Sequence, residues 1–537
     1  MGKNYEVRDP ESLKEAGKAK TVKNKLGENQ TGKSEDSLTK SNNDITYPVP
    51  DLRGNGQLNI NSRRENEQMD PKNVDPEQLK RERRESPETK KEAFDTDEPA
   101  GESEDPVGIK NPRYSDRTPV ALGVTEKEVV EKIAEEGVKN LGKSYQPRFG
   151  IVPSADHKEN FYEQVWTRDF AQATLNYFAV QNHDAVMDSL ETVFRHQRED
   201  GAIPYKTERR YALVQLVSPY LAKRLFKLVR GEKERPLYEG EDFSSAEDTI
   251  PMAIMAAGEF VLASPGGKRF AREDFAKFEK AIEFFGKKVD PRDGLAVMRN
   301  TNADWCDSLD RGGKLGGINV LWVRALRLMG SVAQLLGETD KAAVYREEAS
   351  RVKKGVMEKF YDREGAYFRE EEGVDRLYTT ACVTGSLYLL DPEECVRVQE
   401  TLKRRVKVPS GLKNFDPPFP ENRQVKVFGI PVIRWFNNGY HNESVWPWLN
   451  CQNIQVKIKI ALNHSDEAVR KQYKKEAVED LADMAEMFQE AGGAYEIFHP
   501  ETRKPRNRIF YKPPRNLMGG LAAYQSAYNK MKKLGWI

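Results

Sequence analysis

Cysteine and histidine are scarce in this chain, with four and six residues among 537. The cysteines have none of the spacings typical of zinc ligands, and they fit free thiols in a reducing compartment. With so few imidazoles, a histidine-based zinc site is not expected. The sequence therefore indicates a cytoplasmic protein without a bound metal. The four cysteines are Cys306, Cys382, Cys395 and Cys451.

The chain also lacks long apolar runs and an excess of charge of one sign. No apolar stretch approaches the roughly 20 residues that a membrane-spanning helix needs, and the first residues have no apolar core like that of a signal peptide. The 86 basic and 85 acidic side chains leave a net charge of +1, so no global field attracts nucleic acid or an anionic membrane. Glycine-rich phosphate loops and a serine-nucleophile elbow are also missing. We expect no nucleic-acid partner, no membrane partner and no cofactor, and the oligomeric state is left open.

Apolar clusters are missing from the first part of the chain. Residues 1–119 are rich in Lys, Glu, Asp, Asn, Ser and Pro. Such a segment cannot bury enough surface to offset its ordering entropy, so we expect a disordered, charged leader. Residues 120–537 are dense in aromatic and aliphatic side chains and suffice for one large core.

The second part has the pattern of a series of moderate helices with few strand signals. Periodic apolar residues predict helices in pairs, joined by loops rich in Gly, Pro, Asp and Asn. Aromatic arms around a turn at 360–368 predict a small β-hairpin, and fragments near 424–434 suggest another. No repeat of 30–45 residues is visible, which disfavours a solenoid. We expect an all-α fold in which two rings of helices form a toroid, with loops at one end shaping a cleft. The expected helices lie near 125–141, 168–181, 184–199, 212–229, 247–263, 272–287, 317–336, 340–360, 379–390, 392–405, 443–462, 467–491 and 515–533.

Carboxylates and aromatic rings gather in a few of these loops. Asp304-Trp305-x-Asp307 places two carboxylates beside a ring that can stack on a pyranose. A carboxyl against an aromatic wall loses hydration, so its acid form is favoured near neutral pH. The alternative is that these aspartates cap the helix near Gly317 or bond their own turn.

Glu496 is the candidate for a carboxylate that activates water. It follows Gly492-Gly493, a pair that ends a helix and puts Glu496 on a loop. An exposed loop glutamate without a role is the alternative.

Three further motifs are typical of sugar contacts. Arg168 and Asp169, next to Trp166, can grip vicinal hydroxyls through charged hydrogen bonds, although an Arg–Asp pair is also a common structural bridge. Asp248 opens another helix, and its motif can equally be merely a turn and a helix start. A third group, which could equally be core, comprises Tyr440, His441, Glu443 and Trp446.

The collinear order of these motifs resembles the six-hairpin glycosidases. The order is Trp-x-Arg-Asp, Asp-Gly-x-Ile-Pro, Glu-Asp-Thr, Asp-Trp-x-Asp, Asn-Gly with Trp-Pro, and Tyr-Glu-x-x-x-Pro. The chain is most similar to the group that holds the amylo-1,6-glucosidase part of glycogen debranching enzyme and glycoside hydrolase family 63. The resemblance covers residues 120–537 and implies an (α/α)6 toroid.

The resemblance also implies roles for individual residues. Asp307 would be the general acid, with Asp304 as its competitor, and Glu496 the general base, with Glu443 in reserve. Such enzymes invert the anomeric centre, and their carboxyls stand about 6.5–9.5 Å apart. The implied sugar contacts are Trp166, Arg168, Asp169 and Asp248. The sequence thus predicts an inverting glycoside hydrolase for an α-glucoside or related glycoside.

Three other functions compete with this one. Asp304-Trp305-Cys306-Asp307 is also similar to an element of inverting disaccharide phosphorylases, in which phosphate replaces water. Sugar epimerases share the toroid but use histidines, and only His441 and His499 lie in suggestive places. A toroid that binds carbohydrate without cleaving it is the third.

Overall fold

A computed structural model describes residues 119–157, 162–209, 234–241, 246–299, 304–420, 423, 439–507 and 511–537. All of these belong to one unit of the chain, Ile60–Ile537. The predicted leader up to residue 118, the helix near 212–229 and the hairpin near 424–434 lie outside the described residues.

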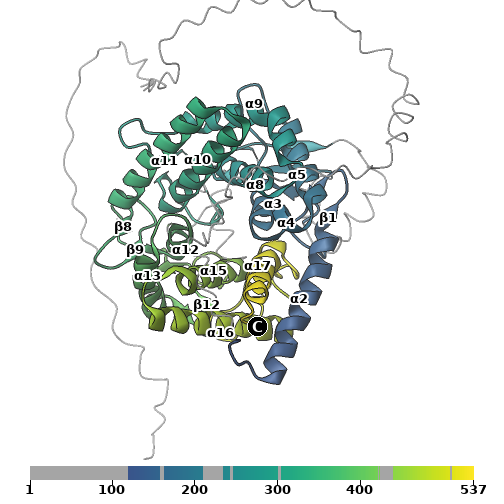
Figure 1. Cartoon of the computed structure of the whole chain (residues 1–537), viewed down its shortest axis with the longest axis vertical. Helices are drawn as coiled ribbons and strands as arrows, with labels where there is room; N and C mark the ends of the chain where they lie inside the picture. The colour runs from purple at the N-terminus through teal and green to yellow at the C-terminus, as the bar shows by residue number, and fades with distance from the viewer. Residues whose placement is uncertain are drawn as a thin grey trace, which may run out of the picture. The chain divides into compact units, whose positions relative to one another are not determined.

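Twelve helices of the described part form two concentric rings (Figure 1). The inner helices alternate with the outer ones along the chain, and each inner helix contacts the next until α17 meets α3. The inner ring consists of α3 (Thr167–Ala173), α8 (Thr249–Ala263), α10 (Gly316–Leu336), α12 (Thr379–Tyr388), α15 (Pro447–Asn463) and α17 (Met518–Leu534). The outer ring consists of α2 (Val124–Ser144), α5 (His183–Arg195), α9 (Gly267–Gly286), α11 (Thr339–Lys359), α13 (Pro392–Arg405) and α16 (Glu467–Ala491). The predicted all-α (α/α)6 toroid is confirmed.

The two rings differ in composition because they differ in burial. Nearly every residue of α12 and α15 is buried, as is most of α8. A helix that packs on all sides cannot carry a charged face, whereas α9 and α13 bury one stripe and expose their Lys, Arg and Glu residues. Within the described ranges, no helix combines the length and apolarity needed to cross a membrane.

Two inner helices begin later than the sequence predicted, one of them at a proline. The sequence predicted helices from about 443 and 515, but α15 begins at Pro447 and α17 at Met518. Proline has no N–H to donate and suits the first turn of a helix, as Pro447 does. α17 begins after Asn516, whose φ is 55°, and the extended Leu517. The predicted helix at 168–181 is found as α3, a π turn η1 (Thr174–Phe178) and α4 (Ala179–Gln181).

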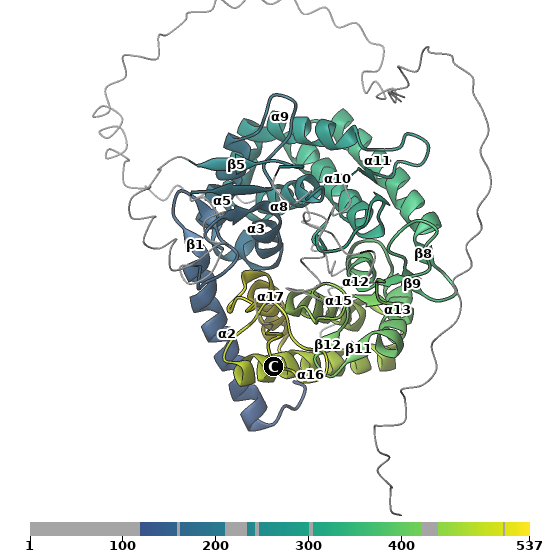
Figure 2. The same cartoon turned by 180° about the vertical axis from the view of Figure 1, so that it is seen from behind.

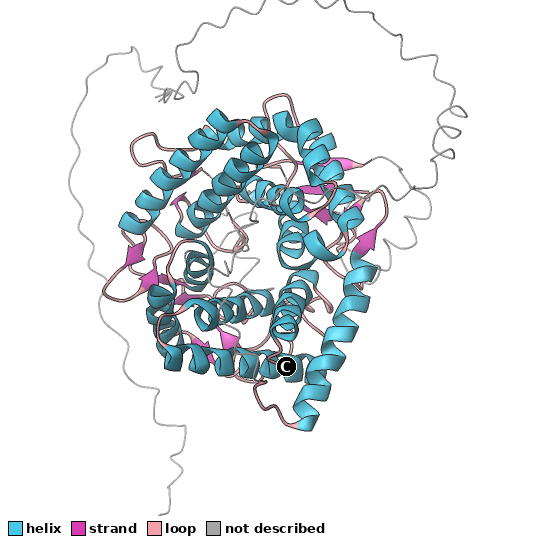
Figure 3. Cartoon of the chain, in the orientation of Figure 1, coloured by secondary structure: helices cyan, strands magenta, loops and turns pink. Residues whose placement is uncertain are grey.

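Short antiparallel strands lie in the connections between the helices (Figure 3). The predicted hairpin at 360–368 is present, with Tyr361 paired to Phe368. The two-stranded pairs are β1 (Tyr145–Gln146) with β2 (Gly150–Ile151), β6 (Val297–Met298) with β7 (Gly313–Lys314), β8 (Tyr361–Asp362) with β9 (Tyr367–Phe368), β10 (Leu377–Tyr378) with β13 (Phe415–Asp416), and β11 (Lys407–Val408) with β12 (Gly411–Leu412). A three-stranded sheet has the order β3 (Val165–Trp166), β4 (Lys206–Glu208) and β5 (Arg235–Leu237).

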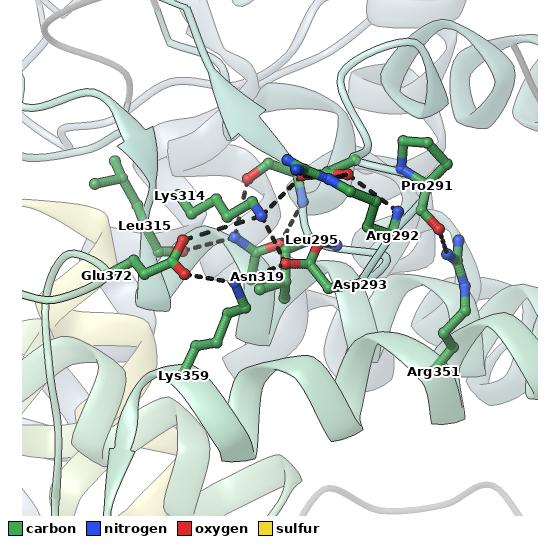
Figure 4. A network of polar contacts seen from close by, with 12 residues as sticks. Pro291, Arg292, Asp293, Leu295, Lys314, Leu315, Asn319, Arg351, Lys359 and Glu372 are labelled. Carbon is green, nitrogen blue, oxygen red and sulfur yellow. Dashed lines mark hydrogen bonds and ion pairs between the residues drawn. The ribbon is translucent and has the colours of Figure 1, made fainter. Parts of the chain in front are cut away.

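The β6–β7 pair fixes both ends of the loop that carries Asp304 and Asp307. Lys314 Nζ donates to Asp290 at 2.9 Å and to Asp293 at 2.6 Å (Figure 4). Asn319, buried in α10, accepts from Ala296 N at 2.7 Å. The loop is therefore held at its base by an ion-pair network and by α10.

The ring closes where its first and last helices meet. Helix α2 packs on α16 and α17, as the view from behind also shows (Figure 2). Val120 N donates to Trp536 O at 2.9 Å. Contacts between opposite ends of residues 120–537 therefore complete the toroid.

Candidate active site

The inner helices bring the predicted residues together at the ends where they begin. Trp166, Asp248 and Trp446 are the residues immediately before α3, α8 and α15, and Tyr378 precedes α12. Backbone N–H groups at such ends carry partial positive charge, which favours nearby carboxylates. Residues separated by hundreds of positions thus face one site.

Arg168 and Asp248 form the most regular contact of the site. Arg168 Nε and Nη2 each donate to one oxygen of Asp248 at 2.7 Å. Asp248 is buried and does not cap α8 with its side chain, so the geometry does not support the interpretation of this residue as a mere helix start. This bidentate pair fixes the guanidinium plane. Asp169 lies beside it, and burial raises the pKa of Asp169 to about 6 against the opposing effect of Arg168.

Asp307 is a half-buried carboxyl without a cationic side chain bound to it. Among the described residues, it accepts a hydrogen bond from its own backbone and from no side chain. Burial raises the pKa of Asp307 to about 6; Arg168 opposes the rise and Asp248 adds to it. Asp307 is therefore able to hold or release a proton close to neutral pH.

Asp304 has a different environment on the same loop. Its carboxylate is paired with Arg311, which is fully buried, and accepts from Tyr378 Oη at 3.1 Å and from Cys306 N at 2.8 Å. Arg311 also bonds Glu370 at 3.2 Å. Three donors satisfy Asp304 as a carboxylate, which suits a structural role better than proton donation. Neither aspartate caps α10, which begins after Leu315.

Glu496 lies among tyrosines. Tyr162 Oη donates to its Oε1 at 2.8 Å, Tyr511 Oη donates to Oε2, and Tyr440 also hydrogen-bonds the carboxyl. Glu496 is only 4% exposed. Burial raises the pKa of Glu496 to about 8, although Tyr162 and Tyr440 oppose this effect.

Electrostatic coupling links these carboxyls into one site. Asp169 and Asp307 both raise the pKa of Glu496, and Asp307 also raises the pKa of Asp169. The predicted acid and base are thus close enough for their charges to interact. Glu443, the reserve base, is 55% exposed on its side chain and pairs with Arg506 at 2.9 Å, which places it in a solvated ion pair.

Aromatic rings form a wall around Trp305, which lies two residues before Asp307 in the chain. Trp305 meets His441 at 5.1 Å and Trp446 and Trp448 at 4.9 Å, each edge to face. His441 stacks on Trp446 at 5.1 Å with an interplanar angle of 2°. The other predicted ring, Trp166, contacts Tyr205 at 5.8 Å.

His441 is a buried, neutral member of this wall. Its Nδ1 bonds Ser308 Oγ at 2.6 Å. Burial lowers the pKa of His441 well below its usual 6.5, and Arg311 and Arg168 lower it further. A histidine held in this way orients Ser308 and Trp305 and is poorly placed for proton transfer.

A cavity extends from these groups between the inner helices. Its lining includes Arg168, Asp248, Asp304, Trp305, Tyr378 and Trp448. In the part of the chain that the structure describes, no three His, Cys, Asp or Glu side chains are grouped to hold a metal ion.

Sequence patterns missed four residues of this site. Tyr162, Tyr511, Arg311 and Tyr378 surround the predicted carboxyls, but no sequence motif predicted a role for them. Tyr162 precedes the Trp166 motif by a few residues, which is the single local signal. Tyr511, Arg311 and Tyr378 are recognisable from the fold alone.

Comparison with known proteins points to carbohydrate enzymes. The family model described as amylo-alpha-1,6-glucosidase matches residues 244–502. No curated protein matches the chain. The match agrees with the predicted nearest group.

Solved structures share the fold at low identity. A family 63 mannosylglycerate hydrolase from Thermus thermophilus, in complex with Tris, is 16% identical over 74% of this chain and 100% of its own, with a TM-score of 0.50. A rhamnosidase from Klebsiella oxytoca with rhamnose bound is 13% identical over 76% of this chain and 65% of its own, with a TM-score of 0.50. A bacterial glucoamylase complexed with acarbose is 12% identical over 76% of this chain and 56% of its own, with a TM-score of 0.50. These findings confirm the predicted resemblance, and family match and fold together support a glycoside hydrolase.

Proposed function

We propose that this chain, which has the family match and the (α/α)6 fold of six-hairpin glycosidases, is an inverting glycoside hydrolase for an α-glucoside or a related small glycoside. Asp307 protonates the leaving oxygen, and Glu496 takes a proton from the attacking water. One observation carries the proposal. The charge of Asp307 acts on Glu496, and the pKa of each carboxyl is raised by burial.

Asp307 suits the acid because it is not committed to another side chain among the described residues. A carboxyl that protonates a leaving oxygen must first hold the proton, and burial with Asp248 nearby favours the neutral form. Asp304 is disfavoured because its carboxyl is paired with Arg311 and accepts from Tyr378 and Cys306 N.

Glu496 suits the base because phenol hydroxyls converge on it. An ionised carboxylate only accepts hydrogen bonds, and Tyr162 and Tyr511 supply donors to both of its oxygens. Between about pH 6 and about pH 8, the pair Asp307 and Glu496 holds a single proton, and the higher pKa of Glu496 places it mainly on Glu496; the reactive form, with the proton on Asp307, is the minor one. One protonated and one ionised carboxyl are what the inverting reaction needs.

Neighbouring groups supply the contacts that a sugar requires. Arg168 with Asp248, and Asp169 beside them, offer fixed charged partners for vicinal hydroxyls. Trp166 and Trp305 offer ring faces or edges for the apolar side of a pyranose. Tyr440, His441 and Trp446 shape the wall behind Trp305.

Water is favoured over phosphate as the second substrate. Asp169, Asp248, Asp307 and Glu496 interact with one another through their charges, and the guanidinium of Arg168 is already bound by Asp248. A second anion entering this pocket is repelled. Epimerase chemistry is disfavoured because His441 is neutral and bound to Ser308.

The test is a screen of sugar release from α-linked di- and oligosaccharides and α-glycosyl glycerates, with and without phosphate. Mannosylglycerate is included because a protein with a similar fold hydrolyses it. We expect phosphate-independent release, lost in Glu496→Gln, with inverted configuration of the first product by proton NMR. A retained anomer contradicts the inverting mechanism. Release only with phosphate indicates a phosphorylase, and binding without turnover indicates a carbohydrate-binding toroid.

A further inference from the structure

Tyrosines from separate parts of the chain converge on Glu496. Tyr162 lies just before β3, whereas Tyr511 lies between Glu496 and α17. Tyr162 donates to one carboxylate oxygen, and Tyr511 donates to the other. Tyr440, before α15, adds a hydrogen bond to the same carboxyl. Each carboxylate oxygen of Glu496 therefore accepts a hydrogen bond from a tyrosine of a different loop.

We propose that Tyr162 and Tyr511 are positioning residues that fix the orientation of the Glu496 carboxyl and favour its ionised form. The proposal rests on the role of Glu496 as the base that activates water. By favouring the anion, the two hydroxyls increase the fraction of the enzyme in which Glu496 can accept a proton.

The arrangement opposes a strong tendency of Glu496 to stay neutral. Burial, Asp169 and Asp307 all raise its pKa, whereas hydrogen bonds from Tyr162 and Tyr440 lower it. Hydrogen bonds to the charged form of a carboxyl favour that form. A protonated Glu496 would have to direct its own O–H toward a phenol oxygen or lose one of these bonds.

Tyr162 and Tyr440 remain protonated, and so remain hydrogen-bond donors, well above neutral pH. Burial raises the pKa of Tyr162 well above 10, and Glu496 and Asp169 raise it further. Burial and Glu496 act on the pKa of Tyr440 in the same way. Tyr162 and Tyr440 therefore do not become anions that would repel the Glu496 carboxylate.

The backbone around Glu496 is secured without the phenols. Glu496 N donates to Pro514 O at 3.0 Å, and Phe498 exchanges backbone hydrogen bonds with Val445 at 2.9 and 3.0 Å. Ile497 is fully buried. Removing a phenol oxygen thus leaves the loop fastened, so the hydroxyls act on the side chain of Glu496.

The test compares Tyr162→Phe and Tyr511→Phe with Tyr495→Phe in the full chain. Tyr495 is adjacent to Glu496 in sequence and half-buried, and its ring meets Phe498 at 6.3 Å, edge to face. It is a matched control because the same hydroxyl is removed from a tyrosine outside the Glu496 hydrogen bonds.

The protonation of Glu496 is followed by difference infrared spectroscopy against Glu496→Gln. We expect its titration midpoint to rise by about one pH unit for each hydroxyl removed at 162 or 511, and to be unchanged in the control.

Turnover gives a second readout. When Glu496 must be ionised while Asp307 holds the proton, a rise of about one pH unit in the midpoint lowers kcat about tenfold and leaves KM nearly unchanged. An unchanged midpoint in both variants, or an equal shift in Tyr495→Phe, overturns the proposal. If one variant fails to fold, the other repeats the test at the opposite oxygen. If no substrate is turned over, the proposed function fails, and the infrared midpoint alone still decides whether the phenols hold the anion.

Discussion

Asp304 and Asp307 belong to the same loop, but the buried guanidinium of Arg311 is paired with Asp304 and leaves Asp307 alone. The loop thus separates two tasks that carboxylates perform. Asp304 neutralises a buried cation and anchors the loop, while Asp307 remains able to exchange a proton. Substitutions at the two positions are expected to affect different properties.

Asp304→Asn is expected to destabilise the fold. Removing one partner of a buried ion pair leaves Arg311 short of a counter-charge, with Glu370 as its remaining anion, and costs about 3 kcal/mol. Denaturant unfolding followed by circular dichroism measures this. An unfolding free energy equal to that of the wild type contradicts the anchoring role.

Asp307→Asn is expected to abolish activity without destabilising the fold. Loss of a general acid lowers kcat by about a thousandfold on a substrate with a poor leaving group. Because burial disfavours the Asp307 anion, an amide of similar shape leaves the unfolding free energy unchanged or higher. Steady-state kinetics and denaturant unfolding of the same preparation test the loss of kcat and the unchanged stability. Activity within a few-fold of wild type refutes the assignment of Asp307 as the general acid.

Substrates with different leaving groups separate the acid from the base. A glycosyl fluoride needs little protonation, so we expect Asp307→Asn to cleave it at a rate near that of the wild type. Glu496→Gln lacks the group that activates water and should fail on the fluoride and on the natural glycoside alike. If Glu496→Gln cleaves the fluoride and Asp307→Asn does not, Glu496 is the acid and Asp307 the base. The higher pKa of Glu496 is the reason for testing this exchange.

Activity should follow a bell-shaped pH profile. Below about pH 6 both Asp307 and Glu496 are protonated and neither accepts a proton from water. Above about pH 8 both are ionised and neither protonates the leaving oxygen. We therefore expect kcat/KM to be greatest between these values. A rate that continues to rise above about pH 9 would contradict the requirement for a protonated carboxyl.

The leader is expected to be dispensable for catalysis. Removing residues 1–118 leaves Val120, whose N–H bonds Trp536 O, and every residue of the site. The shortened protein should keep its kcat and KM on any substrate found in the screen. A clean deletion that folds but is inactive would assign the leader a part in the reaction.

Helices were predictable from the sequence because each ring imposes its own pattern. The outer helix α9 has apolar residues at helical spacing with charged residues between them, and the inner helix α8 is apolar throughout most of its length. The starts of α15 and α17 were misplaced because they depend on local backbone features and not on periodicity. The turn at Gly439 and Pro447 precede or open α15, and the non-helical Asn516 and Leu517 precede α17.

The site was predictable only in part, because its contacts are between distant residues. The motifs indicated which carboxylates matter, but nothing local distinguishes Asp304 from Asp307. The distinction depends on Arg311, which could equally have paired with either. The bond between Tyr162 and Glu496 joins residues 334 positions apart, and no local pattern encodes such a contact.

The closure of the ring between Val120 and Trp536 has a consequence for how the chain folds. Helix α2 is synthesised long before α16 and α17, the helices on which it packs. Until those last helices are made, α2 and the apolar flank of α3 lack their neighbours, and the toroid is an open arc. Contacts of such sequence separation form slowly, and exposed apolar surface promotes aggregation in the meantime. Truncations at the C-terminus should therefore leave insoluble protein rather than a smaller folded one.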